Sequence, residues 1–400
     1  MIGVRLPPIV LAVLAALALA AAPASASGGP GDDNLGFGYG KNFRYGRVLK
    51  LCNIYRSDTA LRTCFTDKLA KLIVESHDSA HELPRVDAYV ATAGGFLQRS
   101  CHGLMHAVGR RYAASAHLTI GGLLHSLPRS NNANCSAGFG HGLLMYLAPQ
   151  IGSLSPAEAV KACDGAPTRY QRYSCVHGFG HAYMRLYAEQ LPFALHSCRL
   201  LGPQNAPDCA AGAFHDYWIA AAGGDQTQRP KNLITSPRLL CAKQSGGFVR
   251  GCWYRALLEH PPAKPLRTAS SVLAVCRGLS GNQHGACVTA AVVVSTSDPF
   301  TQMDLCQTLR RIEASDCVRG VSTPELGQSP RSVQIRLIRR CANVYHPAQG
   351  ACYRWLGTAL NVVTNGEFAD GGCQALSYAA TRDACKAGAE AYEGPLETFS

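Results

Sequence analysis

Short and long amphipathic runs alternate along most of this chain. Residues 352–360 (CYRWLGTAL) form one of the long runs, and their apolar and polar positions follow a helical pattern. The short runs at 155–160, 236–240 and 298–300 open with Ser-Pro or Asp-Pro, which is an N-cap followed by a first helical turn. Polar loops such as 202–208 separate the two kinds of run, and no strand-like alternation occurs. The pattern predicts repeated units of helix A, loop and helix B.

Cysteines mark the same units. Within a unit two cysteines are 11 or 12 residues apart, and from Cys163 onward the units recur every 30 to 43 residues. We expect each pair to form a disulfide that ties the end of helix A to the start of helix B. The pairs are Cys52 with Cys64, Cys163 with Cys175, Cys198 with Cys209, Cys241 with Cys252, Cys276 with Cys287, Cys306 with Cys317, Cys341 with Cys352, and Cys373 with Cys385.

Residues 84–150 interrupt this spacing. Cys101 and Cys135 are 34 residues apart, which is one repeat, and each is expected to begin a helix B. Val90 and His125 stand where the helix A cysteines would be. We expect Cys101 to pair with Cys135 and link neighbouring units, although sequence alone does not determine connectivity.

A small residue recurs three positions after the second cysteine. Glycine inside a helix costs about 1 kcal/mol relative to alanine, so its recurrence needs a packing reason. We expect helix A to approach helix B too closely there for a side chain. The positions are Gly138, Gly178, Gly212, Gly320 and Gly388, with Ala290 also small.

The period and the helix pairs resemble the disulfide-stapled αα-repeat proteins of the Sel1-like and TPR-like kind. The resemblance covers about residues 44–395 and implies an all-α solenoid, either open or closed into a ring. It concerns architecture alone, because the TPR pattern of Trp, Leu-Gly, Tyr and Pro is absent. We divide the array into repeats at 44–230 and repeats at 231–400.

The first residues predict export. Residues 1–26 read as a secretory signal, with Arg5, an apolar run over 9–22 and Ala-Ser-Ala at 24–26. Residues 27–43 read as a flexible leader. An even total of 18 cysteines fits an oxidising extracellular, periplasmic or cell-surface location. No later segment is apolar for long enough to cross a membrane.

Several function classes lack their signatures. The formal charge of +12 is scattered over the chain, whereas nucleic-acid binders concentrate it, so we expect no nucleic-acid partner. The chain has no Cys-x-x-Cys for thiolate metal sites, no His-Glu-x-x-His and no Gly-x-Ser-x-Gly. Since every cysteine is expected in a disulfide, no thiol nucleophile remains.

Histidines are concentrated on four predicted B helices. His141, His181 and His215 lie six residues after their cysteine and His177 lies two after, so all four point within about 40° of one direction. His102 and His106 form another i,i+4 pair one repeat earlier. They lie one and five residues after Cys101, one residue short of the positions in the later units. The later units carry no histidine at these positions. We expect a metal site formed by His102, His106, His141, His177, His181 and His215.

Neutral imidazoles favour copper, zinc or iron over calcium or magnesium. Asp216 is the candidate to orient a ligand or act as a base. Tyr183 and Tyr217 could face the same pocket but fit packing roles better, and His77 with His81 fits a solvated surface. We expect a metal-dependent enzyme acting on an unknown small molecule or peptide, an oxidoreductase rather than a hydrolase because carboxylates are few. The alternative is a non-catalytic repeat protein that binds a protein or peptide on its concave face.

Overall fold

The protein is all-helical wherever the structure describes it. The computed structural model describes residues 44–93, 95–119, 135–166, 169–221, 233–296, 298–322, 330–364 and 373–391, and all regular structure in these ranges is helical. The all-α prediction is confirmed. The predicted signal, the leader and His125 lie outside the described residues.

Helix A and helix B alternate as the sequence predicts. The A helices are short and the B helices are mostly longer. The A helices are α2(Arg44–Cys52), α4(Ser79–Thr92), α10(Pro156–Asp164), α12(Leu191–Leu200), α14(Pro237–Cys241), α16(Ala269–Val275), α18(Pro299–Gln307) and α20(Pro330–Asn343). The B helices are α3(Asp58–Glu75), α6(Cys101–Ser115), α8(Cys135–Tyr146), α11(Arg169–Leu186), α13(Ala206–Ala221), α15(Phe248–Glu259), α17(Gly281–Val293), α19(Arg311–Arg319), α21(Gln349–Thr364) and α23(Ala379–Ala391). Short segments α5(Gly95–Arg99), α9(Ala148–Ile151) and η2(His346–Ala348) join them.

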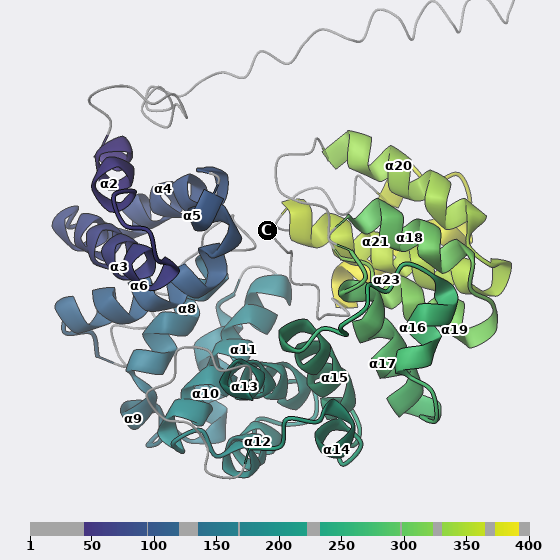
Figure 1. Ribbon diagram of the computed structural model, residues 1–400, viewed down its shortest axis with the longest axis horizontal. Coiled ribbons are helices and arrows are strands. Elements are labelled where there is room, and N and C mark those ends of the chain that lie inside the picture. The colour runs from purple at the N-terminus through teal and green to yellow at the C-terminus, as the bar shows by residue number, and fades with distance from the viewer. Residues whose placement is uncertain are drawn as a thin grey trace, which may run out of the picture.

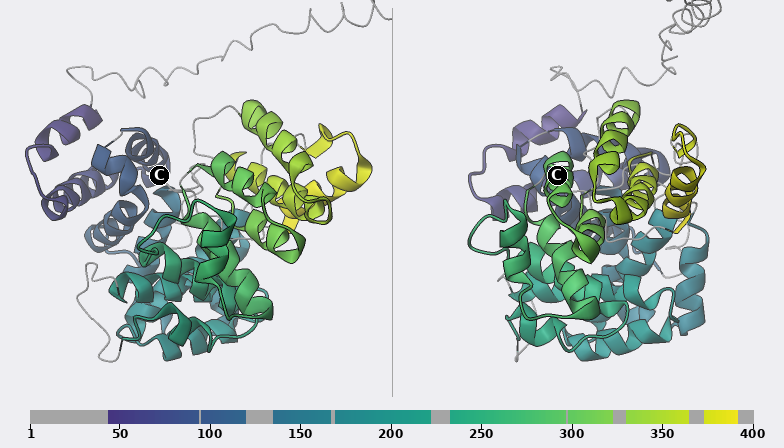
Figure 2. Two further views of the ribbon diagram at one scale, coloured as in Figure 1. Left: turned by 45° about the vertical axis from the view of Figure 1, so that its right-hand side comes forward. Right: turned by 90° about the vertical axis from the view of Figure 1, so that its right-hand side faces the viewer.

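The helix pairs follow one another around an arc. Each B helix from α6 onward packs against the B helix of the next unit and against its own A helix where the structure has one. In Figure 1 the arc runs from α2 through α13 to α23, with α12 and α14 outside α13 and α15. The left view of Figure 2 shows the first helices and the last helices at the two sides of an open end. The described helices therefore form an open array and not a closed ring.

Local disulfides join helix A to helix B in every unit predicted to have one. The eight predicted pairs are all present, with Cα–Cα distances of 5.4–5.7 Å. The bonded pairs are Cys52 with Cys64, Cys163 with Cys175, Cys198 with Cys209, Cys241 with Cys252, Cys276 with Cys287, Cys306 with Cys317, Cys341 with Cys352, and Cys373 with Cys385. No cysteine in the described structure is free. Cys101 is disulfide-bonded, but the side chain of Cys135 lies outside the described structure, so their pairing stays a prediction.

Two of the three expected helix starts are capped by side chains. Ser155 and Glu158 form a reciprocal capping box at the start of α10. Asp298 accepts hydrogen bonds from the backbone N–H groups of Phe300 and Thr301 at the start of α18. Ser236 occupies the N-cap of α14 without a side-chain cap. The Ser-Pro and Asp-Pro patterns thus identified where helix A begins.

The recurring glycines bring successive B helices together, which corrects the expectation that they serve the contact of helix A with helix B. A Cβ at Gly212 of α13 would overlap the carbonyl oxygen of His177 in α11. A Cβ at Gly320, at the end of α19, would likewise overlap the Thr289 carbonyl in α17. The spacing of the glycines correctly indicated a close approach between two helices, but it does not determine which helix is the neighbour. Close backbone approach at glycine joins α6 to α8, α11 to α13, α17 to α19 and α21 to α23.

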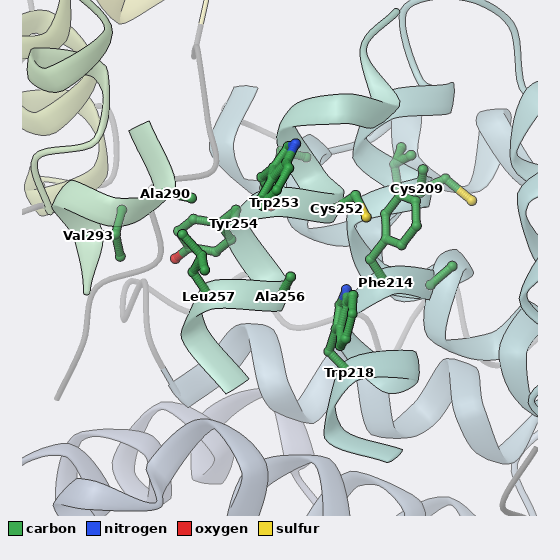
Figure 3. Packing of buried hydrophobic residues seen from close by; sticks show 14 of the residues in the cluster. Cys209, Phe214, Trp218, Cys252, Trp253, Tyr254, Ala256, Leu257, Ala290 and Val293 are labelled. Atoms are coloured by element: carbon green, nitrogen blue, oxygen red, sulfur yellow. The ribbon is translucent and has the colours of Figure 1, made fainter. Parts of the chain in front are cut away.

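Aromatic residues fill the space between consecutive B helices in the middle of the array. Trp218 of α13 and Trp253 of α15 are at most 1 % exposed. Figure 3 shows Phe214 and Trp218 facing α15, and Leu257 of α15 lying toward α17.

No described helix is both long and apolar enough to pass through a bilayer.

Candidate metal centre

The six predicted histidines lie in one cluster. Helix α6 contributes two of them, α8 one, α11 two and α13 one. Neighbouring imidazole rings have centroids 4.6 to 6.3 Å apart. His102 of α6 stacks on His215 of α13 at 6.0 Å, so the first and the last of these helices meet at the cluster. Five rings are at most 8 % exposed and His102 is half-buried.

Glycines hold the histidine-bearing helices close together. A Cβ at Gly138 of α8 would overlap the carbonyl of His102, and one at Gly142 would overlap the carbonyl of His106. Gly178 of α11 lies against the ring of His141, where a Cβ would be 2.9 Å from Cδ2. Backbone packing at this distance lets short imidazole side chains from different helices touch.

Three imidazole nitrogens converge at one point of the cluster. His106 Nε2 lies 3.0 Å from His102 Nε2 and 3.1 Å from His141 Nδ1. A tetrahedral ion with metal–nitrogen bonds of about 2.0–2.1 Å holds its ligand nitrogens about 3.3 Å apart. The ligand atoms of the three histidines all lie within 4.8 Å of one another, so they are close enough for one ion to be shared. This triad could hold a metal ion.

Hydrogen bonds outside the cluster fix the tautomer of His141. Its Nε2 lies 2.9 Å from the carbonyl oxygen of Ser174, which can only accept a hydrogen bond. Nε2 therefore carries the proton, and Nδ1 presents a lone pair toward His106. A backbone carbonyl that orients an imidazole in this way is typical of histidine ligands.

A second triad comprises His141, His177 and His181 and could also hold a metal ion. Nδ1 of His181 donates to Oδ1 of Asp216 at 2.9 Å. The proton on Nδ1 leaves the lone pair on Nε2, as in carboxylate–histidine–metal arrangements. Asp216 therefore contacts a histidine of the cluster, and its role in orienting a metal ligand stays a prediction.

Arg255 also reaches the cluster, and the sequence did not identify it. Its side chain is fully buried, and Nη2 lies 3.4 Å from Nε2 of His177. A guanidinium group can only donate, so Nε2 of His177 is the acceptor. Arg255 lies three residues after Cys252, where three of the four histidine-bearing units have glycine. The break in the glycine pattern was the available signal.

Burial keeps four of the six clustered histidines neutral. The pKa values of His106, His141, His177 and His215 are held well below 6.5, first by burial. For His215 the next cause is the charge of Arg255, and for the other three it is a neighbouring histidine. A neutral imidazole is the form that binds a metal.

Asp216 and Glu259 lie beside histidines of the cluster, and the buried Glu189 interacts with Asp216. Burial raises the pKa of Asp216 to about 6 and that of Glu189 to about 7. Glu189 is 1 % exposed and lies 3.3 Å from Nη1 of Arg185. Glu259 lies 3.9 Å from Nε2 of His215. Sequence reasoning missed Glu189 and Glu259, since neither shares the register of the histidines.

The remaining candidates lie outside the cluster. The Tyr217 hydroxyl bonds to the backbone of Ile234, and Tyr183 is 7 % exposed and packs on Phe179. His77 and His81 are exposed beside the start of α4. The packing role for the tyrosines and the surface role for this histidine pair are thus consistent with the structure.

No family model matches the chain, and no curated protein or solved structure is significantly similar to it.

Proposed function

We propose that the histidine cluster binds a transition metal and that the protein is an exported metal-dependent oxidoreductase. The observation that carries the proposal is that His106 Nε2 lies 3.0 Å from His102 Nε2 and 3.1 Å from His141 Nδ1. Three neutral nitrogen ligands favour copper, iron or zinc. The eight local disulfides support an oxidising compartment.

The first triad is the better site for the ion. In the second triad the guanidinium of Arg255 lies 3.4 Å from Nε2 of His177, and a positive charge there opposes a cation. His181 lies beside the first triad, with its ring centroid 4.9 Å from that of His106 and 5.1 Å from that of His141. We therefore assign the ion to His102, His106 and His141, with His181 as the adjacent ligand.

One buried nitrogen supports a bound group at the cluster. Nδ1 of His215 is buried and has no hydrogen-bond partner within the described structure. Buried polar atoms in native proteins are almost always satisfied by a partner, a water or an ion. A group bound among the histidines would satisfy this atom, which a purely apolar packing role would not.

Burial favours redox chemistry over hydrolysis. A metal hydrolase must bring a scissile bond to a metal-activated water, and that requires an open site. Here three of the four assigned ligand rings, those of His106, His141 and His181, are at most 8 % exposed, and the fourth, His102, is half-buried. A redox-active copper or iron ion exchanges electrons or binds a very small molecule, and both are compatible with such burial. Asp216 would hold the proton of His181 Nδ1 in place during this chemistry.

Copper titration with electron paramagnetic resonance tests the ligand set. The parent should bind Cu²⁺ with hyperfine splitting from several imidazole nitrogens. His106→Gln should lose this signal, whereas His346→Gln, changed in the distant η2 segment, should keep it. If the spectra of the parent and His106→Gln are identical, the cluster is not the metal site. If the protein binds zinc tightly but neither copper nor iron, the cluster is a metal site but the oxidoreductase assignment is wrong.

A further inference from the structure

Exposed apolar side chains gather where the first A helix ends. Leu51 of α2 is 48 % exposed, and Ile54 and Tyr55 in the turn that follows are 69 % and 44 % exposed. Single exposed apolar residues are common on protein surfaces, but neighbouring ones that form a patch mark an interaction surface. We call residues 47–56, which contain this patch, the α2 tip.

Basic side chains flank the patch. Arg47 and Lys50 of α2 and Arg56 after the turn are all exposed. None of the three forms an ion pair within the described structure. The sequence has no Asp or Glu from residue 44 to residue 57, and Asp58 then begins α3. The α2 tip therefore presents apolar and positively charged side chains together.

Contacts with α3 and α4 hold the α2 tip in place. Cys52, between the exposed apolar residues, is bonded to Cys64 of α3. The Tyr45 hydroxyl donates to Oε1 of Glu82 in α4 at 2.8 Å, and its ring stacks on that of Tyr89 with centroids 5.0 Å apart. An anchored loop loses little conformational entropy when it binds a partner.

The position of α2 in the array makes this surface unusual. Figure 1 shows α2 at one end of the arc, beside α3 and away from α13. The end units of repeat arrays generally carry a polar outer face, because no further repeat covers them. An end that is apolar and basic instead needs a reason other than capping.

A bilayer with anionic headgroups matches both features of the α2 tip. Basic side chains are attracted to the negative headgroups, and apolar side chains enter the boundary between headgroups and acyl chains. A stable protein partner would generally need a larger surface, of about 20–30 residues on each side. A small tip with an apolar centre and basic flanks fits the lipid interface better.

We propose that the α2 tip docks the protein onto an anionic membrane surface. Leu51, Ile54 and Tyr55 enter the interface, and the flanking basic residues contact lipid phosphates. The contact is peripheral, because only one turn of the chain enters the lipid. The proposal is independent of the metal site.

Vesicle flotation tests the proposal on the chain from residue 27 onward. Residues 1–26 are omitted because the apolar run over 9–22 would itself bind lipid. The chain should float with phosphatidylcholine vesicles that contain about 30 % phosphatidylglycerol, and roughly tenfold or more weakly with pure phosphatidylcholine. Equal binding to the two kinds of vesicle, or binding to neither, would overturn the proposal.

Replacing the three basic residues tests the contribution of charge. A triple variant with Arg47→Gln, Lys50→Gln and Arg56→Gln should bind the anionic vesicles about 100-fold more weakly, since each basic residue near the surface contributes about fivefold. If the folded triple variant floats as the parent does, the α2 tip is not the docking surface.

A matched control removes three charges elsewhere. Lys161, Lys243 and Lys264 are also exposed, on other units of the array. Replacing all three by Gln should weaken binding less than about threefold, because charges far from the membrane are screened by salt. If this control loses as much binding as the α2 tip variant, net charge alone causes the binding and the proposal fails.

Ile54→Ser tests whether an apolar side chain enters the lipid. It should weaken binding to the anionic vesicles about tenfold. Ile312→Ser is the control, because Ile312 is equally exposed at 68 % on α19, and it should leave binding unchanged. Circular dichroism verifies that each variant keeps its helices. If Ile54→Ser floats as the parent does, the α2 tip recognises charge alone, as it would on an acidic protein, and the membrane proposal is wrong.

Discussion

The carboxylate of Asp216 accepts a hydrogen bond from Nδ1 of His181 at 2.9 Å, and both side chains are buried. This contact fixes the His181 tautomer so that Nε2 is the nitrogen able to bind a metal. We expect Asp216→Asn to lower the metal affinity about 10- to 100-fold, as changes to orienting groups commonly do. Metal titration calorimetry measures the effect.

The control for this change is Asp304→Asn. Asp304 is half-exposed and pairs with Arg340 at 2.8 Å on the surface of the second half of the array. Its replacement removes the same charge from the protein and should leave the metal affinity unchanged. Equal affinities for Asp216→Asn and the parent would show that Asp216 does not position a ligand.

The glycine contacts between B helices predict a large effect of a single methyl group. In Gly212→Ala the new Cβ would overlap the His177 carbonyl, so α11 and α13 must move apart. We expect a loss of about 1–3 kcal/mol in the free energy of unfolding. Urea denaturation measures this loss.

Gly350→Ala is the matched control, because nothing lies within 4 Å of a Cβ at that helical position. Its free energy of unfolding should equal that of the parent or exceed it by up to about 1 kcal/mol. If both alanine variants are as stable as the parent, the close approach of the B helices is not set by these glycines.

The local disulfides should contribute to stability one by one. Replacing Cys241 and Cys252 together by alanine opens a small loop and should cost about 2–4 kcal/mol by freeing the unfolded chain. Non-reducing peptide mapping of the parent should recover the eight local pairs. The same map tests the predicted link of Cys101 to Cys135. Cross-links between distant units would contradict the unit structure.

The buried histidines predict a pH dependence of the metal-free protein. Burial, followed by the charge of His102, holds the pKa of His106 well below 6.5, and unfolding returns it to its usual value. Below pH 6.5 the unfolded chain therefore binds a proton that the folded chain does not. This contribution to stability is present above pH 6.5 and is lost as the pH falls.

His106→Gln removes that contribution. Compared with this variant, the parent should lose up to about 1.4 kcal/mol of stability per pH unit below pH 6.5. Urea denaturation of both proteins at pH 8, 6 and 5, after metal removal, gives the difference. A stability difference that does not change with pH would mean that His106 is not kept neutral by the fold.

Much of the fold follows from local sequence, because the cysteine spacing and the Ser-Pro and Asp-Pro starts each act within one unit. The histidine register likewise placed His141, His177, His181 and His215 on one side of parallel repeats. Arg255 escaped prediction because its contact with His177 joins residues 78 positions apart. The helix that each recurring glycine contacts was predicted wrongly. The spacing of the glycines indicates a close approach of two helices but not which helix is the neighbour.

Metal analysis of the parent chain tests the central claim most directly. The protein is purified under oxidising conditions without a histidine tag and compared with His346→Gln and with a double variant that carries both His106→Gln and His141→Gln. The account predicts about one copper or iron ion per chain in the parent and in His346→Gln, and almost none in the double variant with its disulfides and helices intact. It is contradicted if the parent binds copper, iron or zinc no more tightly than the folded double variant.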